Sequence, residues 1–139
     1  MDYKQMAAEF MKNMQLPGKA RQVKGFGDMH SEAAILMYIN LKKEILPKDI
    51  SAAMGVSTAR IAIALNELEK KGFVTREIDE NDRRRIIVRV TPKGKDFSEE
   101  QRQVFIDRTA EIFEELGEHD TLEYIRITER ITGIMRKRQ

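Results

Sequence analysis

Three consecutive arginines, Arg83 to Arg85, follow Asn81 and Asp82 in the segment NDRRRIIVRV (residues 81–90). Adjacent like charges repel one another, so such a row gives the free protein no stability. The repulsion is relieved when a row of phosphates neutralises the charges. The run therefore indicates binding to a polyanion, and we expect Asp82 to pair with one of the arginines and hold the turn in shape.

A second group of side chains suited to binding lies earlier in the chain. The segment VSTARIAIALNELEKKG (56–72) predicts a helix capped by Ser57. An α-helix fits the major groove of DNA, where Arg pairs with guanine, Asn pairs with adenine and an apolar side chain meets the thymine methyl group. The residues that this pattern predicts to contact DNA are Ser57, Thr58, Ala59, Arg60, Ala62, Ile63 and Asn66. Ser57 and the free N–H groups of the first turn are also expected to hold a phosphate.

The distribution of charge agrees with an anionic partner, although the net charge of +2 is small. Residues 57–95 hold ten basic and six acidic residues, whereas the remainder holds fifteen basic and seventeen acidic ones. A basic segment within a slightly acidic chain is a local electrostatic footprint.

Apolar spacing predicts the helices that position these residues. One amphipathic helix is expected over 2–14, followed by a connector over 16–27. A second helix begins near Asp28 or Ser31, and a third, PKDISAAM, ends at Gly55. The tight turn between the third helix and the helix after Ser57 is the spacing of a helix-turn-helix.

The apolar period then changes to two, which predicts the strands FVTREI and RIIVRVT around a polar hairpin tip at 79–85. Thr91 and Pro92 start a long helix, which Gly117 separates from a last one. The expected fold is mainly α with a small two- to three-stranded antiparallel sheet, a winged helix-turn-helix.

The segment ISAAMGVSTARIAIALNELEKKGFVTREIDENDRRRIIVRVTPKG (50–94) resembles the core of the MarR (multiple antibiotic resistance regulator) family. The resemblance lies in the helix-turn-helix, the joint LEKKGFV, the pair Asp82 and Arg84 in the wing, and the motif VTPKG. It implies a ligand-responsive transcriptional repressor that binds a pseudo-palindromic operator as a homodimer. Arg84 falls on the wing arginine of the family, and Ile63 stands where the family often has a basic residue.

The terminal helices predict the homodimer independently of the resemblance. Their broad apolar faces have no sheet to cover, and a second copy would bury them and place two recognition helices about 34 Å apart. We expect residues 1–28 and 96–139 to dimerise and residues 29–95 to bind DNA, with a small-molecule effector of unknown identity between these parts. Release of DNA by such an effector is expected from the resemblance and from coupling between two sites.

Several other functions find no support in the sequence. The chain has no cysteine, no constellation typical of an enzyme and no glycine loop for phosphates, so we expect neither catalysis nor a cofactor. Two small groups contain a histidine, namely Asp28, His30 and Glu32, and His119 and Glu123. Neither supplies three ligands in a standard motif, so no metal site is expected. The absence of a long apolar run and of a signal-peptide pattern favours the cytoplasm and no contact with a membrane.

Two alternatives remain open on the sequence. A winged helix can bind another protein, with its basic wing on an acidic surface. It can also act as an architectural DNA binder that ignores ligands and binds many sequences with similar affinity.

Overall fold

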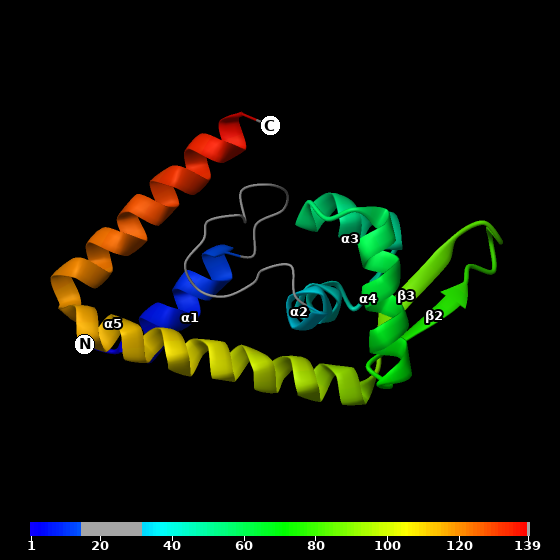
Figure 1. Ribbon diagram of the computed structural model, residues 1–139, viewed down its shortest axis with the longest axis horizontal. Helices are drawn as coiled ribbons and strands as arrows, with labels where there is room; N and C mark the ends of the chain where they lie inside the picture. Colours follow the sequence, from blue (N-terminus) through cyan, green and yellow to red (C-terminus); the bar gives the residue numbers. More distant parts are fainter. Residues whose placement is uncertain (15–31, 139) are drawn as a thin grey trace. The chain divides into compact units, whose positions relative to one another are not determined.

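The computed structural model describes residues 1–14 and 32–138. The chain divides into two compact units (Figure 1). A winged unit runs from α2 (Glu32–Lys42) to Gln101, and a terminal unit combines α1 (Tyr3–Met14) with the chain from Arg102 onward. The predicted connector and the predicted helix start at Asp28 or Ser31 lie outside the described residues.

The winged unit has the predicted order of elements, with one addition. Its small sheet is antiparallel throughout, with the strand order β1-β3-β2. The sequence did not indicate the edge strand β1, which is only two residues long. The elements that follow α2 in this unit are β1 (Glu44–Ile45), α3 (Pro47–Met54), α4 (Thr58–Lys70), β2 (Val74–Ile78) and β3 (Ile86–Val90). The mainly helical fold with a small antiparallel sheet is therefore confirmed.

The two helices of the helix-turn-helix end and begin as their residue types predict. Gly55 adopts φ 64° and ψ 34° after α3, the left-handed conformation that glycine reaches without a steric penalty. Ser57 caps α4, because its side-chain oxygen accepts a hydrogen bond from the backbone N–H of Arg60 at 3.2 Å. One side of α4 is buried in the unit's core, and its buried members are Ile61, Leu65 and Leu68.

The register of the hairpin decides which side chains share a face of the sheet. Val74 pairs with Val90, Arg76 with Val88, and Ile78 with Ile86. Because directly paired residues lie on one face and successive residues alternate, these six side chains lie on the same face. Val74 and Val88 are buried in the core on that face.

One hydroxyl and one glycine join the hairpin to α5 (Pro92–Lys137). The Thr91 hydroxyl accepts a hydrogen bond from the Gly94 N–H at 3.0 Å and donates one to the Gly72 carbonyl at 2.6 Å. A β-carbon at position 94 would lie 2.0 Å from the carbonyl oxygen of Phe73, so only glycine fits there. The predicted cap at Thr91 is confirmed, and it also holds the turn after α4.

Gly117 interrupts α5 as the sequence predicted. Its φ of 82° and ψ of 171° are not helical, and they fall in a region that essentially only glycine occupies. The buried Thr121 hydroxyl donates a hydrogen bond of 2.9 Å to the Phe113 carbonyl and so joins the two sides of the break.

Along α5, the terminal unit buries four threonines and exposes four isoleucines, although Ile106 is buried. Its core contains Phe10 and Phe113, whose rings meet edge to face at 5.7 Å. The large apolar side chains of α5 that remain more than a third exposed are Val104, Ile112, Leu116, Leu122, Ile127, Ile131 and Ile134. By contrast, Thr109, Thr121, Thr128 and Thr132 are buried. The apolar stripe that the sequence predicted therefore lies largely on the surface of a single chain.

Candidate nucleic-acid interface

The outward side of α4 carries the residues that the sequence predicted for groove contact. Thr58, Ala59, Arg60, Ala62, Ile63 and Asn66 are all exposed, as is the cap Ser57. The Ile63 side chain is 65% exposed, although the apolar stripe on the opposite side of the helix is buried. The helix thus presents a continuous surface whose small side chains permit close approach of a base edge.

Asn66 is held by a residue that the sequence did not single out. Arg76, on β2, donates a hydrogen bond from Nη2 to the Asn66 amide oxygen at 2.8 Å. The same guanidinium reaches both carboxylate oxygens of Glu69, at 3.1 and 3.3 Å. The pKa of Glu69 lies below its usual value because Arg76 donates to the carboxylate. Arg76 therefore fixes the orientation of the Asn66 amide, whose N–H groups and second oxygen lone pair are directed by this contact.

The wing tip is an ordered turn that Asp82 organises. One carboxylate oxygen of Asp82 accepts a hydrogen bond from the Arg84 backbone N–H at 3.0 Å and lies 3.5 Å from Arg84 Nε. The Asp79 carboxylate accepts a hydrogen bond from the Asn81 backbone N–H at 2.9 Å and lies 3.8 Å from the Arg85 guanidinium. The expected pairing of Asp82 with an arginine is therefore present.

The arginines of the tip remain available to an external anion. The Arg84 side chain is 93% exposed, and about half of the Arg85 side chain is exposed. Arg83 is also exposed. Because exposed ion pairs in water contribute little, the two carboxylates arrange the tip more than they neutralise it.

Arg89 is a basic residue of the same sheet that is already engaged. It pairs with Glu44 on β1 and with Glu77 on β2. These carboxylates raise the pKa of Arg89, the Glu44 hydrogen bond contributing most. The basic surface suited to a polyanion therefore comprises the wing tip and the outward side of α4.

Comparison with known proteins agrees with this arrangement. Residues 25–85 match the model of the MarR family. The chain is 29% identical over 105 residues to the HTH-type transcriptional regulator SarZ of Staphylococcus saprophyticus, covering 73% of this chain and 72% of SarZ. It is 30% identical over 82 residues to the transcriptional repressor MprA of Escherichia coli K12, covering 59% of this chain and about half (47%) of MprA.

This chain is similar to MarR-type winged-helix transcriptional regulators.

The fold of this chain agrees with that of similar solved structures. Streptococcus pneumoniae FabT, whose crystal structure is a complex with DNA, matches with a TM-score of 0.67 at 19% identity, over 78% of this chain and 76% of FabT. The matching curated proteins are named as transcriptional regulators, which agrees with the expectation that the chain is not an enzyme.

The sequence did not single out Arg76, Ile78 and Ile86 of the winged unit as candidates for contact with DNA. Arg76 was counted only as one of ten basic residues, and Ile78 and Ile86 only as members of strands. Two-residue alternation places Arg76 and Ile78 on one face of β2, and the register of the hairpin places Ile86 on the same face. The sequence does not indicate where the sheet extends beyond the hydrophobic core, and so it does not predict that Ile78 and Ile86 are exposed.

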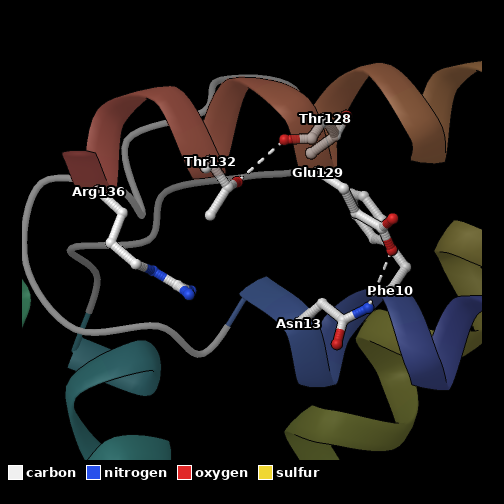
Figure 2. A pocket seen from close by; sticks show the side chains of 7 residues that line it. Phe10, Asn13, Thr128, Glu129, Thr132 and Arg136 are labelled. Carbon is white, nitrogen blue, oxygen red and sulfur yellow. Dashed lines mark hydrogen bonds between the residues drawn. The ribbon is translucent and has the colours of Figure 1, made fainter.

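The chain also contains a cavity of about 270 Å³ within the terminal unit, between α1 and the end of α5 (Figure 2). Figure 2 shows the Arg136 guanidinium directed into this space. Nearby, Asn13 donates a hydrogen bond to Glu129 and the Thr132 hydroxyl donates one to the Thr128 carbonyl. The lining residues are Phe10, Asn13, Thr128, Glu129, Thr132, Gly133 and Arg136.

No group of three potential metal ligands gathers within residues 1–14 and 32–138. The first predicted cluster, around His30, lies outside the described residues. In the second, Glu123 already accepts two hydrogen bonds from Arg126.

None of the helices that the structure describes combines the length and the apolar composition that crossing a bilayer requires.

Proposed function

We propose that this regulator binds a pseudo-palindromic operator as a homodimer and represses transcription until an effector releases it. The observation that carries the proposal is the joining of two exposed elements by Arg76, which ties β2 of the wing to the outward side of α4. In this arrangement α4 enters the major groove while the arginine tip reaches the adjacent minor groove or backbone.

The roles within this interface follow from residue type. Arg83, Arg84 and Arg85 bind phosphates or the narrow minor groove and set affinity. Arg60, Ile63 and Asn66 meet base edges and set sequence preference, while Thr58, Ala59 and Ala62 allow the helix to approach. Ser57 and the first turn of α4 hold a backbone phosphate.

The homodimer is supported by the exposed apolar stripe of α5. Seven large apolar side chains are exposed on the two helical parts of α5, on either side of Gly117, while four threonines are buried there. Large exposed apolar surface marks an interface. A second copy supplies a matching surface and doubles the DNA contacts, which makes an inverted repeat the expected operator.

The direction of regulation and the response to a ligand rest on different observations. MprA, to which the chain is similar, is named as a repressor. The cavity in Figure 2 is close to the lower end of the size range of small-molecule sites. Its aromatic, hydroxyl and guanidinium groups suit a small amphipathic anion. Such an anion is expected to raise the melting temperature of the wild type and not that of the Arg136→Gln variant.

Binding to a palindromic fragment from the regulator's own upstream region, measured against rising salt, tests the proposal. If several phosphates are contacted, log K falls linearly with log salt, by about 0.9 for each contact. The operator should also be preferred over unrelated duplex by about 10³-fold or more. A flat salt dependence would favour a protein-binding winged helix, and equal affinity for all duplexes would favour an architectural DNA binder.

A further inference from the structure

We infer that the wing makes an apolar contact with the sugar edge of the DNA backbone through Ile78 and Ile86. This inference rests on the proposed binding of duplex DNA and adds to it a contact that is not ionic. It assigns a role to the two side chains at the outer end of the wing sheet, next to the arginine tip.

The register of the sheet fixes the direction in which these two side chains point. Ile78 and Ile86 are paired across the hairpin, and each lies two residues from the Arg76–Val88 pair. Arg76 reaches α4 to bind Asn66 and Glu69, so this face of the sheet is turned toward the recognition helix. Figure 1 shows the hairpin beside α4. The isoleucine pair therefore lies on the inner face of the wing.

The side chains on this face become more exposed toward the tip of the hairpin, where the sheet extends beyond the hydrophobic core. Val88 is fully buried, whereas Ile78 is 66% exposed and Ile86 is 44% exposed on the same face. A sheet face that continues beyond its core ordinarily becomes polar, because exposed apolar surface next to water gains nothing. Two β-branched apolar side chains at this position indicate an external surface that covers them.

The surroundings of the pair point to a nucleic-acid backbone as that surface. The arginine tip, where three consecutive cations are exposed, directly follows the pair along the hairpin. A duplex strand that lies between α4 and the wing places its phosphates toward these cations and the C–H surface of its deoxyriboses toward the isoleucines. Apolar side chains that accompany arginine are a recurring means of binding the minor groove. The occupant is therefore the sugar-phosphate backbone and not an apolar protein surface.

The double variant Ile78→Thr/Ile86→Thr tests the contact in the full chain, with the operator fragment as the probe. Threonine preserves the branched side chain that strands favour, so the melting temperature should be unchanged. Removing apolar contact without removing charge should weaken binding by about tenfold at every salt concentration. The plot of log K against log salt should therefore shift down in parallel, with its slope unchanged.

Two further variants make the result specific. Arg84→Ala removes a charge and should lower the salt slope by about 0.9. Leu41→Gln removes another exposed apolar side chain, 54% exposed on α2 of the same unit, and should leave DNA affinity unchanged.

Three results would overturn the inference in distinguishable ways. Wild-type affinity in the double variant would show that the pair does not touch DNA, while the proposed function would stand. Unchanged affinity with an altered sedimentation mass would assign the face to a second copy of the chain. An absence of operator binding by the wild type itself would remove the proposed function and the inference together.

Discussion

The Arg76 guanidinium donates a hydrogen bond to the amide oxygen of Asn66 and so joins the wing to the recognition helix by a contact of 2.8 Å. The same guanidinium holds Glu69 one turn further along α4. The orientation of the side chain predicted to read adenine is thus set by a strand residue.

Replacing Arg76 by alanine should change sequence preference more than affinity. Without Arg76 the Asn66 amide is free to rotate, so discrimination at the base pair opposite Asn66 should change by about tenfold, which is about 1.4 kcal/mol. Competition between operator fragments that differ at single positions measures this effect. Arg76→Lys keeps the charge but loses the planar guanidinium that contacts Asn66 and Glu69 together, so it should behave like Arg76→Ala. If both variants keep the wild-type sequence preference, Arg76 serves folding alone.

Asp82 provides a prediction in which two physical effects have opposite signs. Removing its charge makes the tip more basic and favours DNA binding, whereas removing its oxygens releases the Arg84 backbone and disorders the tip. Asp82→Asn keeps an acceptor for the Arg84 N–H and should bind at least as tightly as the wild type. Asp82→Ala should bind more weakly than Asp82→Asn, by about fivefold, for the loss of a hydrogen bond of about 1 kcal/mol. Equal affinities of the two variants would show that the turn does not depend on Asp82.

Gly94→Ala should be severely destabilising. The added β-carbon would lie 2.0 Å from a backbone oxygen of Phe73, which cannot move without displacing the end of the turn after α4. We expect a loss of at least about 3 kcal/mol in the free energy of unfolding, measured by urea denaturation. Gly133 is a matched control within α5, because nothing lies within 4 Å of a β-carbon there, and Gly133→Ala should gain about 0.5–1 kcal/mol.

A charge in the exposed stripe of α5 should separate the proposed homodimer. Ile127 and Ile131 are 47% and 40% exposed in the single chain, so an acidic residue there costs a monomer little. Burying an unpaired carboxylate in an interface costs several kcal/mol. Ile127→Asp/Ile131→Asp should therefore sediment as a monomer that keeps its helical content, whereas Leu41→Asp should leave the mass unchanged. A wild-type chain that sediments as a monomer would refute the homodimer.

The Arg76–Glu69 pair should make stability depend on acid pH. Because Arg76 lowers the pKa of Glu69 in the folded chain, the pair stabilises the fold above the unfolded value of 4.5. This contribution is lost as pH falls through the folded pKa. The melting temperature of the wild type should therefore fall more steeply below about pH 4.5 than that of Glu69→Gln. Parallel curves would show that the exposed pair contributes nothing.

The elements of the winged unit could be predicted because local chemistry determines their ends. Ser57, Gly55 and Thr91 each act at the position where their residue types indicated a cap or a turn. The position of Gly117 in a break of α5 was likewise local, because its backbone conformation is one that glycine reaches at low cost.

What could not be predicted depends on long-range geometry. The engagement of Asn66 by Arg76 joins residues ten positions apart through the packing of β2 on α4, and no local pattern specifies it. The strand β1 is too short to show a period, and its pairing with β3 arises from residues far away in the sequence. Apolar spacing predicted the stripe of α5 but not that four threonines would be buried while most of the stripe is exposed.

Thr91 ends the hairpin with a single hydroxyl that is bonded on both sides, to the Gly72 carbonyl after α4 and to the Gly94 N–H in the first turn of α5. A displacement of that first turn must either carry the end of α4 with it or break one of these two bonds. The oxygen atom thus ties the first turn of α5 to the turn that ends α4, the helix proposed to contact DNA.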